Sequence, residues 1–381
     1  MKMQFSEELK QIARTVQEFI DNEVEPFANQ IEEEDHVPEH LLQTAKELGL
    51  YGMGIPEEYG GLGLGVVGKC LVLEKMGRTH NGFVSIISAH TGIGSTGIVR
   101  LGSEYLKNKY LPALAEGKLL AAFALSEPEA GSDATNLKTR AEKKGDRWIV
   151  NGMKHFITNG PYADLFTVIA VTDPTKGVKG GFTAFAVEKN FPGFKVGAVD
   201  KKMGLRGSHT AQLFFEDLEV PEENVIGEVG MGYANALKIL TEGRCTLAAR
   251  AYGSCQKLIE LATDYMQQRV QFGKPIATNQ GLRWILADMA TETEVGRAFN
   301  YSVAERLENG EKALKEAAMT KLFATDTFNK VADRALQIFG GLGYMKEYAV
   351  ERFYRDARIT KIYEGTNEIQ RNIIAANILG K

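Results

Sequence analysis

One carboxylate near the C-terminus stands in a setting that suits a general base. Glu364 follows Ile362 and Tyr363 and precedes Gly365 and Thr366. A glutamate is a weak base in water, where its pKa is about 4.3, but apolar neighbours strip its hydration and make it more basic. It could then remove a carbon-bound proton near neutral pH. The alternative is an exposed Glu at an ordinary helix entry, since Thr366 is a good N-cap residue.

Two glycine-containing segments could approach a phosphate group. Residues 123–133 begin with strand-type side chains and end in a turn, where backbone N–H groups and Ser132 could serve as donors. A plain strand-to-loop junction fits equally well. Residues 337–344 follow a helical pattern and open no helix after a strand, so they are not a dinucleotide fingerprint. For them we prefer a glycine helix cap.

Other chemistry is less well supported. Arg269 closes a helical pattern and could reach a phosphate, or it could simply face the negative end of the helix dipole. The six histidines lack metal-ligand spacing, and no Ser/His/Asp pattern occurs. The net charge of -4 gives no cationic field for nucleic acid. We therefore expect neither a metal site nor acyl-serine chemistry, and no nucleic-acid partner.

The elements that must position these residues follow a helix, sheet, helix order. Apolar side chains recur at helical spacing from Ser6 to about residue 117, broken by a glycine-rich loop at residues 54–63. Helices are expected to resume at residues 71–76 and again from residue 93 to residue 110. Beyond residue 120, Asn151-Gly152 predicts the type I′ turn of a hairpin, and short strands are expected at residues 166–171, 182–187 and 213–215.

From residue 230 the pattern is helical again, with broad apolar faces. Such faces favour a four-helix packing core and contact with other chains. The predicted fold is therefore mostly α with a central β-domain, divided into residues 1–120, 121–229 and 230–381. A chain of 381 residues is long enough for two or three such units.

Composition also predicts a compartment. The three cysteines cannot all pair and show no CxxC spacing, so we expect reduced thiols. The N-terminus carries acids where a targeting peptide would be basic, and no apolar run is expected to reach membrane-spanning length. These features predict a cytoplasmic protein without a membrane span.

Taken together, these stretches closely resemble the acyl-CoA dehydrogenase family of flavoproteins, from the loop at residues 55–61 to Glu364 and Arg371. The resemblance implies an N-terminal helical domain, a middle β-barrel-like domain and a C-terminal four-helix bundle, with FAD as cofactor. It also implies that Glu364 takes the α-proton of an acyl-CoA while flavin N5 accepts a hydride from the β-carbon, giving the trans-2-enoyl-CoA. A flavin ribityl hydroxyl and the backbone N–H of the glutamate polarise the thioester oxygen in that family.

A subset of the family, exemplified by isovaleryl-CoA dehydrogenases, places the base immediately before an Arg on a helix. That position is Gly243 here, ahead of Arg244. Glu242 lies one residue further back and is the competing candidate.

The resemblance implies a cofactor site shared between subunits. FAD contacts within one subunit fall on Phe123, Leu125, Ser126, Gly131, Ser132, Phe156, Thr158, Thr366, Asn367 and Glu368. Contacts reaching the FAD of another subunit fall on Arg269, Phe272, Gln280, Gln337, Gly340 and Gly341. Substrate contacts fall on Ser132, Thr241, Arg244 and Gly365. Many relatives carry Trp at the position of Phe156 and Asp at that of Thr241, which leaves the flavin potential and the CoA contacts open.

Partners and rivals follow from the same resemblance. It implies a homotetramer that passes electrons to an electron-transfer flavoprotein. The small residues at 90–97 could deepen the acyl pocket for a short or medium linear chain, or allow close helix packing. The rival enzyme is an acyl-CoA oxidase using oxygen, which usually carries a long extra C-terminal domain. A non-catalytic helical scaffold is the rival from another class.

Overall fold

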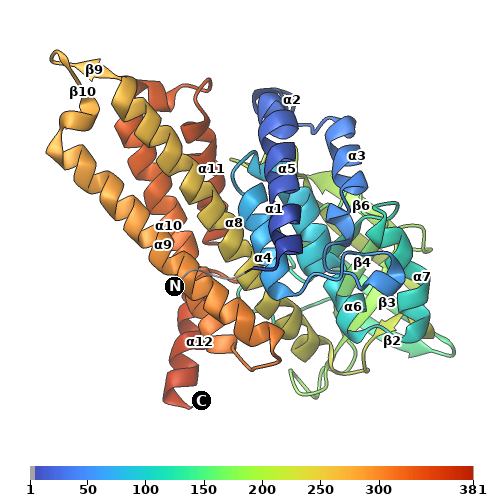
Figure 1. The fold of residues 1–381 in the computed structure, drawn as a ribbon. Coiled ribbons are helices and arrows are strands. Elements are labelled where there is room, and N and C mark those ends of the chain that lie inside the picture. The colour runs from blue at the N-terminus through green and yellow to red at the C-terminus, as the bar shows by residue number, and fades with distance from the viewer. Residues whose placement is uncertain (1–4, 381) are drawn as a thin grey trace.

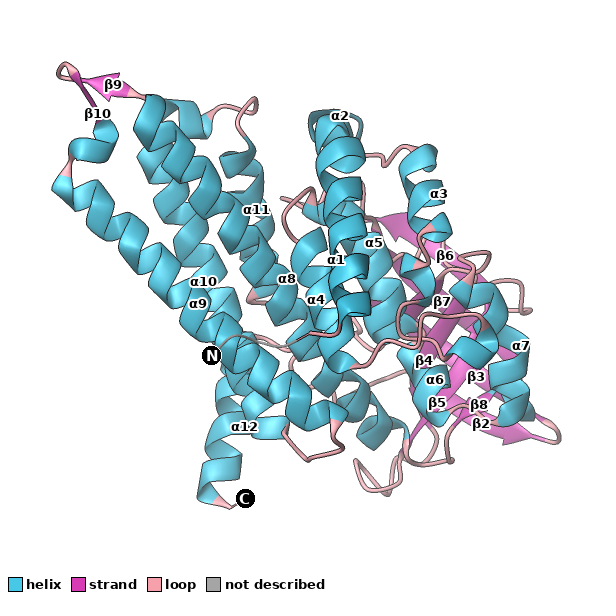
Figure 2. Cartoon of the chain, viewed as in Figure 1, coloured by secondary structure: helices cyan, strands magenta, loops and turns pink. Residues whose placement is uncertain are grey.

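The protein is described by a computed structural model that covers residues 5–380. Helices occupy both ends of the chain and a sheet lies between them in sequence, so the predicted class, mostly α with a central β-domain, is confirmed (Figure 1; Figure 2). The N-terminal helices are α1 (Glu7–Phe19), α2 (Ala28–Glu34), α3 (Glu39–Glu47), α4 (Val66–Met76), α5 (Asn81–Ala89), α6 (Thr96–Leu101) and α7 (Glu104–Ala115).

The helical stretch expected over residues 93–110 is divided between two α-helices. A π-helical turn, η5 (His90–Gly94), leads into α6, which ends at Leu101. Gly102 is extended, and the Ser103 hydroxyl then accepts a hydrogen bond from Leu106 N and caps the new helix α7. The Gly-Ser pair that separates the helices was hidden by a continuous apolar periodicity on both sides of it.

The stretch from α5 to α6 also corrects the expectation about membrane spans. By length and composition alone, Asn81–Leu101 could cross a membrane. However, 72% of its most apolar window is buried inside the protein, as in a core helix. Its apolar surface is already covered by other elements of the chain.

The middle of the chain forms one mixed sheet of eight strands in the order β6-β7-β3-β2-β4-β5-β8, with β1 paired in parallel to β4. The strands are β1 (Ala121–Ala124), β2 (Arg140–Lys144), β3 (Arg147–Thr158), β4 (Leu165–Val171), β5 (Phe182–Glu188), β6 (Phe194–Val199), β7 (Thr210–Pro221) and β8 (Val225–Ile226). Every residue of β4 is buried because the sheet has covered faces on both sides of that strand.

The predicted hairpin turn at Asn151-Gly152 is wrong. Both residues lie inside β3, and the chain turns earlier, at Gly145 between β2 and β3. Gly152 has φ +144°, and the pairing of β3 with β7 skips a residue there, which marks a β-bulge. A Cβ at this position would lie 2.6 Å from Thr139 Cα, so glycine serves close approach and not a turn. The charged sequence of β2 concealed the true first strand of the hairpin.

The C-terminal helices are α8 (Gly232–Gln268), α9 (Gln280–Glu308), α10 (Leu314–Phe339), α11 (Ala349–Thr360) and α12 (Asn367–Leu379). A short hairpin, β9 (Val270–Gln271) and β10 (Lys274–Pro275), joins α8 to α9 at the end of the bundle furthest from the sheet (Figure 1). Buried residues of α8, α10 and α11 share one apolar cluster, which gives the bundle its core.

The three parts of the chain meet at a polar junction. Arg355 of α11 pairs with Glu32 of α2 at 2.6 Å. Asp356 accepts a hydrogen bond of 2.6 Å from the backbone N–H of Leu205, in the loop between β6 and β7. In the same loop, Arg206 donates to the backbone carbonyl of Glu32. Helical and sheet segments are therefore tied directly to one another by charged groups.

Candidate active site

Glu364 lies in the tight loop between α11 and α12, and both it and Gly365 have left-handed backbones, with φ +53° and +87°. Glutamate rarely adopts such a φ, so the loop must be held by its neighbours. Gln370 of α12 donates to the carbonyl oxygens of Gly365 (2.9 Å) and Glu364 (3.3 Å), and Lys321 of α10 donates to that of Gly365 (3.0 Å). Two helices thus fix the backbone that carries the candidate base.

The Glu364 carboxylate is desolvated and free to react. Its Oε2 atom is buried and has no hydrogen-bond partner. A Cβ built on Gly243 of α8 would lie 2.8 Å from that oxygen, so glycine leaves room for the carboxylate. Burial raises the pKa of Glu364, and the cations of Arg250, Lys321 and Arg244 offset only part of that increase. The expectation of a poorly hydrated base agrees with this geometry.

The raised pKa predicts the acid limb of the pH profile. A base acts only when deprotonated, and a raised pKa keeps Glu364 protonated up to a higher pH than an ordinary glutamate. We expect kcat/KM to fall as the pH drops through this raised pKa, above the ordinary value of about 4.5. A pH series of kcat/KM at constant ionic strength measures it. A profile that stays flat down to pH 4.5 would contradict a desolvated base.

The competing base, Glu242, is occupied by cations. Its Oε2 lies 3.1 Å from Lys69 Nζ and its Oε1 lies 2.8 Å from Arg100, so both oxygens are paired. The position immediately before Arg244, where a second family pattern places the base, is Gly243, which faces the Glu364 carboxylate. The Gly243 position and the Glu364 carboxylate therefore lie at the same place, whereas Glu242 is paired elsewhere.

The two predicted substrate contacts on α8 differ in orientation. The Thr241 hydroxyl donates back to the carbonyl of Leu237 on its own helix at 2.7 Å. Arg244 is only 2% exposed, and its Nε and NH1 atoms have no hydrogen-bond partner. A buried guanidinium with unsatisfied donors costs free energy unless a ligand supplies the acceptors. Arg244 is therefore the stronger ligand contact of the two.

The sheet supplies a second group of predicted residues. Phe123 ends β1 with its neighbour Ala124, and Leu125 and Ser126 follow in the loop. Ser126 accepts a hydrogen bond of 2.9 Å from the N–H of His155 on β3. Because β1 and β3 are linked there, Phe156 and Thr158 at the end of β3 lie beside the loop that carries Leu125 and Ser126.

The aromatic residue on β3 is displayed, not buried. Phe156 has φ +60° and is 62% exposed. One face of its ring stacks on His155, with centroids 3.9 Å apart and planes 9° from parallel. His155 is held by Asp200, whose carboxylate lies 3.0 Å from Nε2. An exposed ring backed by a second ring is a platform on which a planar ligand can stack.

The turn after β1 is also open. A Cβ on Gly131 would meet no atom within 4 Å, and Ser132 beside it is exposed. The aromatic platform, the open glycine turn and the exposed hydroxyl together fit a flavin nucleotide, which needs a surface for its ring and donors for its phosphates.

A buried ion pair lies under this loop. Lys154 Nζ donates to the Leu125 carbonyl at 2.9 Å and to Glu127 at 2.8 Å, and both side chains are almost fully buried. Burial lowers the pKa of Lys154 to about 8 against the attraction of Glu127. Glu127 also accepts from the N–H groups of Lys138 and Thr139. The ion pair therefore holds the segment after β1 at the Leu125 carbonyl and at the N–H groups of Lys138 and Thr139.

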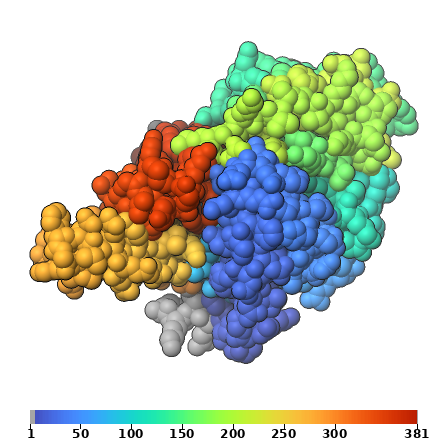
Figure 3. All heavy atoms as spheres, turned by 90° about the horizontal axis from the view of Figure 1, so that it is seen from above, coloured from blue at the N-terminus to red at the C-terminus, as the bar shows by residue number. Residues whose placement is uncertain are grey.

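The third group of predicted residues lies elsewhere. Arg269 caps the end of α8, Phe272 at the tip of the β9–β10 hairpin is fully exposed, and Gly340 ends α10 with φ +60°. This end of the bundle protrudes away from the sheet (Figure 1; Figure 3). The structure therefore brings together two of the three groups and leaves Arg269, Phe272, Gln280, Gln337, Gly340 and Gly341 pointing away from their own chain's candidate site.

The residues after Gly365 have partly structural roles. Thr366 caps α12 by accepting from Ile369 N. Asn367 is 1% exposed. Its amide oxygen accepts hydrogen bonds from Lys321 and Thr325, and its amide nitrogen donates one to Asp326. Its side chain thus supports the loop, and only its backbone is left for a cofactor. Glu368 is exposed.

The small residues at 90–97 were expected either to deepen an acyl pocket or to allow close helix packing, and the structure shows examples of both kinds of environment. A Cβ on Gly94 would lie 2.8 Å from the Ala121 carbonyl group, and one on Gly97 would lie 3.3 Å from Ile239, so both serve close packing. A Cβ on Gly92 would meet nothing within 4 Å, and this residue is partly exposed. Of these three glycines, only Gly92 borders open space, at the π-helical turn η5.

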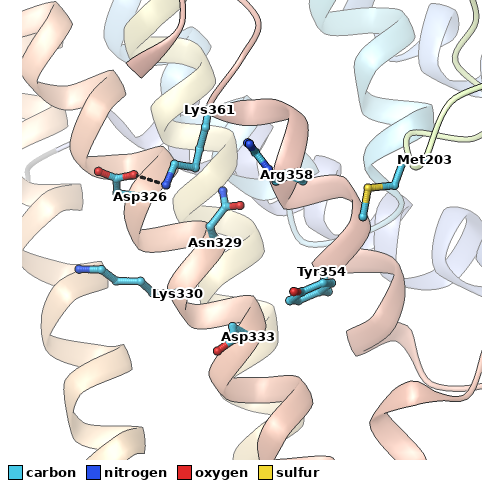
Figure 4. Close-up of a pocket in the computed structure, with 8 residues that line it drawn as sticks. All are labelled: Met203, Asp326, Asn329, Lys330, Asp333, Tyr354, Arg358 and Lys361. Atoms are coloured by element: carbon cyan, nitrogen blue, oxygen red, sulfur yellow. Dashed lines mark ion pairs between the residues drawn. The ribbon is translucent and has the colours of Figure 1, made fainter. Parts of the chain in front are cut away.

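A separate hollow of about 360 Å³ lies between α10 and α11 (Figure 4). Its lining residues are Met203, Asp326, Asn329, Lys330, Asp333, Tyr354, Arg358 and Lys361. None of them is a predicted site residue. Its ion pair between Asp326 and Lys361, at 2.7 Å, braces the start of the Glu364 loop from outside.

Sequence reasoning missed the residues that support the site. Lys321, Gln370, Arg250 and the Lys154–Glu127 pair lie in ordinary helical or strand sequence with no local motif. Their role depends on contacts across 5 to 165 positions of the chain, from Gln370 with Gly365 to Arg250 with Ser85. A charged or amide residue on an apolar helix face was the only available signal.

Comparisons with known proteins agree with this arrangement. Three domain models match in order: "Acyl-CoA dehydrogenase, N-terminal domain" over residues 6–118, the "middle domain" over 122–218 and the "C-terminal domain" over 230–379. An acyl-CoA dehydrogenase of Bacillus subtilis is 46% identical over 99% of this chain and 100% of its own length.

Solved structures are similar over the whole chain. The butyryl-CoA dehydrogenase of Megasphaera elsdenii is 37% identical, with a TM-score of 0.96 and full coverage of both chains. An acyl-CoA dehydrogenase of Bacillus anthracis, solved in complex with FAD, is 40% identical with a TM-score of 0.91, covering 99% of this chain and 68% of that one.

Proposed function

Because the chain belongs to the acyl-CoA dehydrogenase family, we propose that it converts an acyl-CoA thioester into the trans-2-enoyl-CoA with Glu364 as the base. The chain is an FAD-dependent oxidoreductase. The observation that carries the assignment of the base is the buried, unpartnered Oε2 of Glu364 beside the open backbone of Gly243.

Glu364 contributes two groups to the reaction. Its carboxylate takes the α-proton, which leaves the bonding electrons on the α-carbon. Its backbone N–H makes no hydrogen bond within residues 5–380, so it is available to the thioester oxygen, where negative charge develops. The left-handed backbone at Glu364 and Gly365 presents both groups to one side of the loop. Polarisation of the oxygen is what makes the α-proton acidic enough for a carboxylate.

FAD, when bound, supplies N5 as the acceptor of the β-hydrogen with its electron pair. Within one subunit, its ring and pyrophosphate would be held by Phe123, Leu125, Ser126, Gly131, Ser132, Phe156 and Thr158. The backbone of three further residues would assist: Thr366, Asn367 and Glu368. The cofactor of a neighbouring subunit would be reached by Arg269, Phe272, Gln280, Gln337, Gly340 and Gly341. The exposure of Phe272 and the distance of this group from its own sheet support that division.

This sharing supports a homotetramer. Large apolar side chains on the outer faces of the bundle remain exposed in one chain, among them Trp284 (62%), Val295 (61%) and Tyr344 (80%). Surfaces of that kind usually mark contacts with another chain. We further propose three domains at residues 1–120, 121–229 and 230–381, an electron-transfer flavoprotein as electron acceptor, and a cytoplasmic location, where the three free thiols stay reduced.

An anaerobic titration tests the function. We expect at least one member of a panel of straight and branched acyl-CoAs to bleach the flavin absorbance of the holoenzyme. In stopped flow, the reduced enzyme should then reoxidise faster with electron-transfer flavoprotein than with oxygen. Fast reoxidation by oxygen would favour an acyl-CoA oxidase, and purified protein without a flavin spectrum would favour a non-catalytic scaffold.

A further inference from the structure

One buried cation near Glu364 forms no ion pair within 4 Å among residues 5–380. Arg250 of α8 is 6% exposed. Its NH1 donates to the hydroxyls of Ser85 (3.1 Å) and Ser88 (3.2 Å) on α5, and its NH2 donates to the Tyr363 hydroxyl. No carboxylate of the described residues lies within 4 Å of its guanidinium. Three neutral hydroxyls are an unusual environment for a buried charge.

Some other buried cations of the described residues form ion pairs. Arg352, which is 2% exposed, pairs with Glu25 at 3.2 Å, and Lys154 pairs with Glu127 at 2.8 Å. Arg250 forms no such pair, a condition that it shares with Arg244 and Lys321, the other two cations around Glu364. Removing a charge from water without an opposite charge costs free energy, so an anion that arrives with a ligand would recover part of that cost.

Arg250 lies at the active site. Tyr363, which it contacts, is adjacent to Glu364, and the Arg250 guanidinium lies 5.8 Å from the Tyr363 ring centre. Ser85 and Ser88 end the helix that continues into η5, whose Ile93 faces Gly243 and Glu364. Ser88 and Gly92 are both partly exposed, and Gly92 has open space at its Cβ position. The cation therefore borders the space next to the base.

The region around Glu364 holds more cations than carboxylates. Arg244, Arg250 and Lys321 surround a single carboxylate, Glu364. Lys321 is committed to the Gly365 carbonyl and Asn367. Arg244 is already a proposed contact of the substrate. Two of the five N–H donors of Arg250 have no partner among residues 5–380. A guanidinium with free donors matches the two oxygens of a carboxylate.

We propose that Arg250, with Ser85 and Ser88, binds a carboxylate at the far end of the acyl chain, so that the substrate class is the CoA thioester of a dicarboxylic acid. This inference rests on the proposed function and narrows it. The expected short or medium linear acyl group is then one that ends in an anion. Glu364 keeps its role, because the α- and β-hydrogens of such a chain leave in the same way.

Matched substrates isolate the charge. The FAD-loaded enzyme is assayed with succinyl-, glutaryl- and adipyl-CoA, and with the monomethyl ester of each, which keeps the chain and removes the anion. We expect kcat/KM for the best free acid to exceed that for its ester by at least about tenfold, in line with the strength of charged hydrogen bonds. Equal or better turnover of the esters would overturn the proposal.

Variants of Arg250 test whether this residue causes the preference for free acids over esters. Arg250→Gln should lower the acid-to-ester ratio of kcat/KM at least about tenfold, and Arg250→Lys should retain part of it. Arg14→Gln is the matched control, because Arg14 is exposed on α1 and bonds only Gln11 of the same helix. An Arg250→Gln enzyme that lost activity equally on acids and esters, or that kept the wild-type ratio, would overturn the proposal.

A binding measurement covers the case in which Arg250→Gln fails to fold. In the Glu364→Gln holoenzyme, with Arg250 intact, free acids should perturb the flavin spectrum at concentrations at least about tenfold lower than their esters. Equal affinities would count against the carboxylate site. Failure of the proposed function itself differs visibly: no acyl-CoA, acidic or neutral, would then bleach the flavin of the wild-type enzyme.

Discussion

Glu364→Gln should lower kcat by about 10²- to 10⁴-fold, the contribution expected of a positioned general base. The amide has nearly the same shape and keeps the backbone N–H in place, but it cannot accept the α-proton. Its Oε2 counterpart would lie in the same buried space beside Gly243, so folding should be preserved. Single-turnover reduction of the flavin by an acyl-CoA, followed by absorbance, measures the loss.

Glu242→Gln is the informative comparison for that experiment. Both oxygens of Glu242 are paired with cations, Lys69 and Arg100, so its loss should affect stability more than the rate of flavin reduction. The flavin content of both variants should equal that of the wild type. Full turnover by Glu364→Gln, or a larger rate loss in Glu242→Gln, would move the base to the other position.

Lys154→Met should destabilise the protein by about 3–5 kcal/mol and weaken retention of FAD. The change leaves the Glu127 carboxylate buried without its cation, and unpaired buried charges carry penalties of that size. It also frees the Leu125 carbonyl, which accepts from Lys154 at 2.9 Å. The loop that follows β1, which we propose contacts the flavin, then loses its anchor. Thermal unfolding and the fraction of flavin released on dilution measure the two effects.

Two further variants separate the pair from a general loss of charge. Lys143→Met removes a cation whose partner, Glu222, lies at the surface, so it should cost no more than about 1 kcal/mol. Adding Glu127→Gln to Lys154→Met removes the stranded charge and should recover part of the stability. If Lys154→Met unfolded at the wild-type temperature and kept its flavin, the pair would have no such role.

Sequence alone predicted the order of the elements and singled out Glu364 as the candidate base, because both leave local signals. Residues around Glu364 are contiguous, and their apolar and small neighbours already describe a desolvated carboxylate. Helical periodicity likewise revealed the long C-terminal helices. The hairpin failed because Asn-Gly has two uses, a tight turn and a bulge, and only the contact of Gly152 with Thr139 distinguishes them.

The supporting residues could not be predicted for a different reason. Arg250 and Lys321 are ordinary charged residues on helices until the fold places them beside Glu364. Their significance comes from what they lack, an acidic partner, and a missing contact leaves no trace in a one-dimensional pattern. The same holds for Gln370, whose amide holds the Glu364 loop from one turn further along α12.

The polar junction of Arg355, Glu32, Asp356 and the 205–206 backbone bears on how such chains can be recombined. Each of its contacts joins segments that a domain swap would separate, and each leaves a charged or polar group stranded if its counterpart changes. Chimeras built by exchanging the sheet segment alone should therefore be destabilised at this junction. The three segments should therefore be exchanged together.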